Sequence, residues 1–92
     1  MINLTQKTYN EINKELADRV AGLRKRKKLS QQELAGKAGV SFGSVKRFEQ
    51  TGEISLKSLT KIAIALDVET ELMELFCRVP FSSIEEVING QG

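Results

Sequence analysis

Histidine and tryptophan are absent from this 92-residue chain, and cysteine and proline occur once each. Without histidine and with a single cysteine, the sequence lacks the usual general base, the usual nucleophile–base pairs and the usual zinc ligand sets. Cys77 has no partner within the chain for a disulfide, which is typical of a reducing compartment. The composition therefore argues against an enzyme, and we expect no catalytic residues, no metal site and no cofactor.

Long apolar runs are also missing. No stretch of about 18 apolar residues is present, so we expect no membrane-spanning segment. The first residues, MINLTQKTYNEIN, do not combine a basic start with an apolar stretch and therefore do not resemble a secretory signal. We expect a soluble, cytoplasmic protein. The length fits one domain over residues 1–92, and the apolar fraction of 40% favours a folded domain over disorder.

The net charge of +2 conceals an uneven distribution of charged residues. Residues 19–47 contain nine Lys and Arg against one Glu, a net charge of +8. Residues 1–18 hold two Lys against three acids, and residues 48–92 hold three cations against eight acids. A basic middle between acidic flanks indicates a polyanionic partner for the middle, whereas the plainer interpretation of such a charge run is a solvated helix face.

The spacing of apolar residues predicts an all-α protein. One helix face is formed at spacings of three and four by Tyr9, Ile12, Leu16, Val20 and Leu23. Thr8 and Glu11 have the spacing of a capping box at the start of this helix. Residues 8–28 fit either one helix or two helices with a break near Asn13, and the pattern leaves both open.

Clear start and stop signals follow in the next segments. Ser30 with Glu33 is a second capping box and predicts a helix over residues 31–38, which ends at Gly39 because glycine tolerates the left-handed conformation. Ser41 is the predicted cap of a third helix, and Ser55 caps a fourth. The expected inner face of the fourth helix comprises Leu56, Leu59, Ile62, Ala63 and Leu66. A short fifth helix is predicted around residues 70–78, ended by Pro80, and a sixth after Ser83.

The second and third helices are joined by only three residues, Gly39-Val40-Ser41. So short a link forces a sharp crossing instead of an antiparallel hairpin, which describes a helix-turn-helix. Small Ala35 at the point of closest approach, with Val45 and Phe48 pointing inward, agrees with this arrangement. We assign the helix-turn-helix to residues 31–50 within a core of residues 16–76, and residues 77–92 to a segment for a dimer or partner.

The segment LSQQELAGKAGVSFGSVKRFEQTGEISLKSLTKIAIALDV, residues 29–68, resembles the phage-repressor-like, or Xre-type, helix-turn-helix DNA-binding family. With the first helix, the resemblance covers residues 16–76. It implies an all-α, five-helix repressor-type domain with an N-terminal helical extension and a short C-terminal helix. It also implies that the second helix lies across the DNA backbone, that the third enters the major groove, and that dimers read half-sites about one helical turn apart.

The resemblance assigns roles to individual residues. Gln31 occupies the start of the second helix, where the family's glutamine contacts a phosphate. The groove-facing positions of the third helix are occupied by Phe42, Gly43, Ser44, Lys46 and Arg47. Arg47 is expected to donate to guanine and Lys46 to reach a phosphate. Arg24 and Glu49 match a pair that, in related repressors, forms a salt bridge between the first helix and the end of the third.

The start of the third helix leaves two interpretations open. In one, Phe42 lies against thymine methyl groups and Gly43 lets the backbone approach the bases, at a helix cost of up to about 1 kcal/mol. In the other, Phe42 folds sideways onto the second helix and Gly43 is incidental. The next loop, QTGEIS, departs from the family because it holds Glu53 and no cation, which Lys57 at the start of the fourth helix replaces in part.

The sequence thus favours a DNA-binding transcription regulator, a dimeric repressor that reads a short palindrome with its third helix. Its expected partners are double-stranded DNA and a second copy of the chain. An antitoxin, which binds a toxin protein and represses its own operon, is the first alternative. A protein-interaction module whose helix-turn-helix no longer touches DNA is the second.

Overall fold

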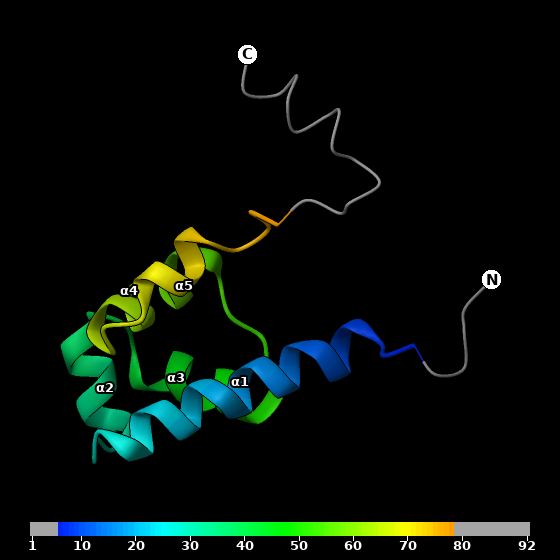
Figure 1. The fold of residues 1–92 in the computed structure, drawn as a ribbon. Helices are drawn as coiled ribbons and strands as arrows, with labels where there is room; N and C mark the ends of the chain where they lie inside the picture. Colours follow the sequence, from blue (N-terminus) through cyan, green and yellow to red (C-terminus); the bar gives the residue numbers. More distant parts are fainter. Residues whose placement is uncertain (1–5, 79–92) are drawn as a thin grey trace.

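The computed structural model describes residues 6–78, which form five helices and no strand (Figure 1). The helices are α1 (Tyr9–Arg26), α2 (Gln31–Ala38), α3 (Phe42–Thr51), α4 (Leu56–Ala65) and α5 (Glu69–Met73). The prediction of an all-α fold is therefore confirmed. The sixth helix expected after Ser83 lies outside the described residues.

Both predicted capping boxes are present. The Thr8 hydroxyl accepts a hydrogen bond from the Glu11 N–H at 3.2 Å, and the Glu11 carboxylate accepts one from the Thr8 N–H at 3.1 Å. Ser30 and Glu33 make the same reciprocal pair at the start of α2, at 3.0 and 2.8 Å. These bonds satisfy amides that a helix start leaves unpaired. Residues 9–26 form one helix without a break at Asn13.

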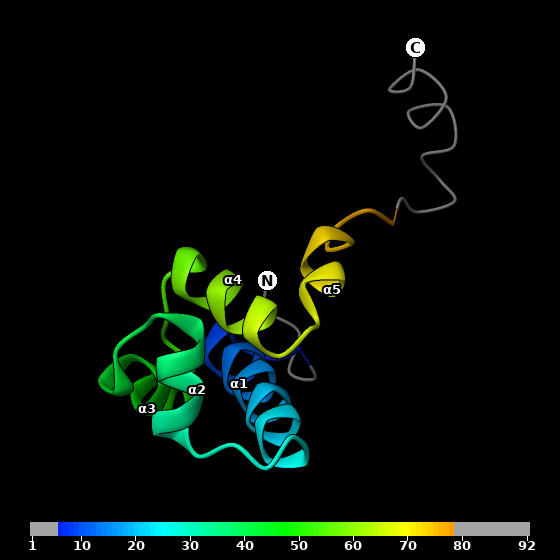
Figure 2. The ribbon, with the colours of Figure 1, turned by 90° about the vertical axis from the view of Figure 1, so that its left-hand side faces the viewer.

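The core lies where α2, α3 and α4 meet. α1 packs on α3, α2 packs on both α3 and α4, and α5 contacts α4 (Figure 2). The buried cluster consists of Leu34, Ala35, Val45, Ile62 and Leu66, and the side chains of Val20 and Leu23 from α1 pack against it. The helices α2, α3 and α4 thus contribute apolar residues that their sequence period places on one face.

The apolar stripe of α1 is buried only in its second half, so the predicted inner face is partly wrong. Tyr9 is 73% and Ile12 54% exposed, and Leu16 is also exposed. The N-terminal turns of α1 project beyond the other helices of residues 6–78 (Figure 1). Periodicity therefore identified the face correctly but could not show how far along the helix the other elements cover it.

Two expectations for the C-terminal half are also wrong. Leu56, placed on the inner face of α4, is 71% exposed at the first residue of that helix. The fifth helix ends at Met73, well before Pro80, and Phe76 adopts a left-handed backbone with φ 63°. Because helical conformation is already lost at Phe76, Pro80 does not set the end of the helix.

Gly52 fixes the end of α3 against α1. It is buried, has φ +81°, and a Cβ at this position would lie 2.7 Å from the Asn13 carbonyl carbon. The substitution Gly52→Ala therefore adds left-handed strain to a clash with backbone, and we expect it to cost about 2–4 kcal/mol of unfolding free energy. Urea unfolding followed by circular dichroism measures this loss.

Gly36→Ala is the matched control. Gly36 lies inside α2, and a Cβ there would meet nothing within 4 Å. Because alanine favours helix over glycine, this variant should gain up to about 1 kcal/mol. Equal stability of the two variants would contradict the close approach of α1 to Gly52.

Candidate nucleic-acid interface

The helix-turn-helix is held by a tight turn between α2 and α3. Gly39 has a left-handed backbone with φ 71°, and its N–H and that of Val40 both donate to the Ala35 carbonyl, at 2.9 and 3.1 Å. Ser41 then caps α3, its hydroxyl accepting from the Ser44 N–H at 3.0 Å. The local hydrogen bonds therefore set the direction in which α3 leaves the turn.

α3 has an inner and an outer face. Val45 and Phe48 are 0% and 1% exposed and face the core. Lys46 and Arg47 are exposed on the outer side of the helix. The helix thus carries two neighbouring cations on the side away from the core.

The other predicted residues of α3 are also accessible. Phe42 is 41% exposed. Gly43 is exposed too, and a Cβ added there would lie 4.0 Å from the Ser41 hydroxyl, so a side chain would have room. Ser44 is half-buried, and its hydroxyl is hydrogen-bonded to that of Ser41 at 2.8 Å. The Ser44 side chain is thus engaged with the helix cap.

A buried ion pair joins α1 to α3. The Arg24 Nε and Nη2 atoms donate to the two carboxylate oxygens of Glu49 at 2.7 and 3.0 Å, and both side chains are about nine-tenths buried. Arg24 Nη1 also donates to the Leu29 carbonyl at 2.7 Å. Gln31 completes the network, because its Nε2 atom donates to Glu49 at 2.9 Å. The start of α2 is therefore tied to the end of α3 through one carboxylate.

The network shifts the pKa of both charged groups. The hydrogen bond from Glu49 raises the pKa of Arg24 above its ordinary value, against the opposing effect of burial. Burial by itself would raise the pKa of Glu49, but the hydrogen bonds from Arg24 and Gln31 and nearby positive charge together hold it below its ordinary value. Glu49 is thus kept ionised in the folded protein.

Two further contacts of this region were missed by sequence reasoning. Lys14 Nζ donates to the Glu49 carbonyl at 3.0 Å, which satisfies an acceptor in the last turn of α3. Arg47 Nη2 lies 3.2 Å from both carboxylate oxygens of Glu53, the acid in the loop after α3. Neither contact has a fixed sequence spacing, so no pattern could have identified it.

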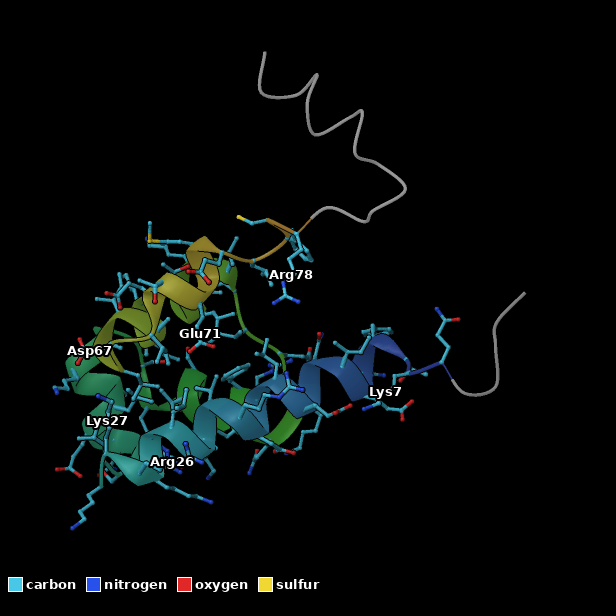
Figure 3. The ribbon with its side chains drawn as sticks, viewed as in Figure 1. Lys7, Arg26, Lys27, Asp67, Glu71 and Arg78 are labelled. Carbon is cyan, nitrogen blue, oxygen red and sulfur yellow. The ribbon has the colours of Figure 1, made fainter. Side chains whose placement is uncertain are left out.

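Other exposed cations lie on α4 and at the end of α1. Lys57 is exposed near the start of α4, on the helix that follows the Glu53 loop. At the C-terminal end of α1, Arg26 is exposed and Lys27 lies 3.6 Å from Asp67 (Figure 3).

Within residues 6–78, no group of three His, Cys, Asp or Glu is placed to hold a metal ion. The helices of these residues are too short or too polar to span a bilayer.

Comparison with known families matches residues 20–73, more than half of the chain, to the helix-turn-helix family of the Xre type. The chain belongs to this family. Comparison with curated proteins found no match. The matched residues include all of α2, α3, α4 and α5, and every residue of the candidate interface described above except Lys14.

Membership in this family makes the protein a DNA-binding transcription regulator. The family match begins at Val20, inside α1, so the projecting turns with Tyr9 and Ile12 precede it. The helical extension is therefore a feature of this chain that the family match does not include.

Proposed function

We propose that the protein acts as a dimer that reads a two-fold-related DNA site, with one α3 in the major groove at each half-site. The observation that carries this proposal is the two-sided α3. Val45 and Phe48 are fully buried, whereas Lys46 and Arg47 are exposed on the opposite side. Arg47 donates to a guanine and Lys46 binds a phosphate in this arrangement.

The leading end of α3 supports close approach to the bases. Gly43 is not needed by the fold, because a side chain there would have room. The lack of a side chain at Gly43 leaves space for the DNA. The ring of Phe42, which is 41% exposed, is available to thymine methyl groups. This favours the interpretation in which Phe42 and Gly43 face the groove.

Gln31 remains suited to a phosphate contact. Its Nε2 atom carries two hydrogens, of which one is used by Glu49. The second hydrogen and the unpaired amides at the start of α2 can then bind the same phosphate. Glu49 thereby holds the Gln31 amide in place, and Lys57 adds a cation from α4.

An apolar surface supports the dimer. Four large apolar side chains on α4, α5 and the residues after them are exposed, namely Ile64, Met73, Leu75 and Phe76, the last at 92%. Large apolar side chains that are exposed on a small protein often form an interface between copies. Two copies joined there would present two α3 helices related by a two-fold axis.

Selection of bound duplexes from a random DNA pool tests the proposal. We expect an inverted repeat with half-site centres about 10–10.5 base pairs apart, the spacing of one helical turn. Arg47→Ala should lose the preference at one base pair of each half-site, a loss of roughly 10- to 100-fold in discrimination. Single, unrepeated sites would contradict the dimer, and recovery of random sequence would contradict specific reading.

Lys7→Ala is the control for this variant. Lys7 is exposed at the projecting end of α1, where it pairs with Glu15 (Figure 3). The substitution removes one positive charge, as Arg47→Ala does, but lies outside the proposed interface with DNA. Its selected site should be identical to that of the wild type.

An antitoxin that also represses its own operon is the second candidate function. It is favoured by the exposed apolar side chains of Tyr9 and Ile12, on turns of α1 that precede the family match. Co-expression with the product of a neighbouring gene tests it. A complex of fixed stoichiometry that Ile12→Asp abolishes, with DNA binding retained, would support the antitoxin over a lone repressor.

A further inference from the structure

The acidic residue in the loop after α3 lies next to the cation proposed to read a base. Arg47 and Glu53 are both well exposed, at 67% and 60% of their side chains, yet they form an ion pair. An exposed pair of this kind contributes little to stability. A contribution to folding therefore does not explain why an acid faces the DNA side of the protein.

The geometry of the pair leaves most of the guanidinium free. A single nitrogen, Nη2, lies 3.2 Å from both carboxylate oxygens. A guanidinium carries five N–H donors, and within residues 6–78 the Arg47 side chain makes no other hydrogen bond. Nη2 carries two hydrogens, so when Glu53 accepts from one of them, the other can still donate to a guanine together with the neighbouring N–H of Nη1 or Nε on the same edge.

The backbone around Glu53 is fixed on both sides. The Thr51 hydroxyl donates to the Arg47 carbonyl at 2.8 Å and accepts from the Glu53 N–H at 3.1 Å. Gly52 between them is buried against the Asn13 backbone. Glu53 thus projects from a point that is tied both to α3 and to α1.

The pair borders a shallow hollow of about 340 Å³ between α3 and the start of α4, lined by Ser44, Arg47, Glu53, Ile54, Ser55 and Ser58. Arg47 and Glu53 are the charged residues of this lining, and three of the other four are serines. A base edge that enters from outside therefore meets a cation whose side-chain direction is set by one neighbouring carboxylate.

We propose that Glu53 is a specificity-determining residue, which orients Arg47 for guanine while its own charge repels phosphate. This inference rests on the proposed reading of DNA by α3. Orientation strengthens binding to the correct base only, whereas repulsion weakens binding to every sequence. Both effects raise the ratio of specific to non-specific affinity.

Glu53→Gln separates these effects because it keeps the size of the side chain and removes its charge. Non-specific binding to a random duplex should tighten about 2- to 5-fold at low salt. Discrimination at the base pair read by Arg47 should fall about 3- to 10-fold, part of what one Arg–guanine contact provides. Titrations with the selected duplex and a duplex changed at that base pair measure both quantities. Glu15→Gln removes the acid of another exposed ion pair, the one that Glu15 on α1 forms with Lys7, so it is the charge-matched control and should change neither.

The same titrations in an Arg47→Ala background decide whether Glu53 acts through Arg47. There Glu53→Gln should have no further effect on discrimination. A loss that persists without Arg47 would mean that Glu53 reads a base itself and would overturn the inference. Equal tightening on all duplexes would reduce Glu53 to simple repulsion and would overturn it too, as would no change on any. If the wild type binds no duplex, the proposed function fails instead.

Discussion

The affinity of the protein for its DNA site is expected to fall about 10³- to 10⁵-fold between 50 and 200 mM salt, the range for a dimer that engages six to ten phosphates. Phosphates bound by Lys and Arg release condensed counterions, and added salt opposes that release. The cations available include Lys46 on α3 and Lys57 on α4, both exposed. Fluorescence anisotropy titrations with a labelled duplex at several salt concentrations measure the slope of log affinity against log salt concentration.

Single substitutions show which cations produce the slope. Lys46→Gln should reduce it by about one per subunit, because one phosphate contact is lost in each copy. Lys7→Gln is the control, since Lys7 precedes α1 at its projecting end and pairs with Glu15 (Figure 3). A wild-type affinity that does not change with salt would contradict binding through phosphates altogether.

The substitution Glu49→Ala is expected to cost about 3–5 kcal/mol of unfolding free energy, because it leaves the Arg24 guanidinium buried without its counter-charge. The Arg24 side chain is only 10% exposed, so water could not replace the lost carboxylate. The loss would be a large share of the stability of a small domain. Urea unfolding of the two proteins measures it.

The same chain supplies the control. Glu53→Ala breaks an Arg–Glu pair of the same chemistry that is exposed, and it should cost less than about 1 kcal/mol. Replacing both buried partners, Arg24→Met with Glu49→Leu, should cost less than Glu49→Ala alone, because no unpaired charge is left. If Glu49→Ala and Glu53→Ala were equally mild, the buried network would not exist in solution.

The pH dependence of Glu49→Gln checks the same network. The pKa of Glu49 is lowered in the folded protein, so its stabilisation is fully present above the unfolded carboxyl pKa of about 4.3 and is lost as pH falls through the lower folded value. The stability difference between wild type and Glu49→Gln should thus be largest above pH 5 and shrink toward pH 2. The lowered pKa values of Glu11 and Glu33 add the same pH dependence of unfolding free energy to both proteins, so they cancel in the difference. A stability difference that does not change with pH would contradict the lowered pKa of Glu49 in the folded protein.

Local features of the fold were predictable because their causes are local. The capping boxes at Thr8 and Ser30 and the left-handed Gly39 depend on residues within one turn of each other. The three-residue link then limits how α2 and α3 can cross. The helix-turn-helix followed from the sequence for this reason, while the roles of Gln31 and Arg47 came from the resemblance and remain proposals.

Features that depend on distant parts of the chain were not predictable in the same way. The exposure of Tyr9 and Leu56 depends on which elements cover them, and a periodic pattern carries no such information. Arg47 and Glu53 lie on either side of the left-handed turn at Gly52, and their ion pair has no sequence spacing that would predict it.

The sequence by itself determined α2, α3 and α4, the caps of the first four helices and the inner face of α3, because side-chain period and capping act within a few residues. Tertiary structure decided how far each cation is buried and how near to an acid it lies. Arg24 is buried against Glu49, Lys27 lies near Asp67, and Arg47 faces outward beside Glu53. The physical reason is that the energy of a charge depends on burial and on neighbouring charges, and both are set by helices far apart along the chain.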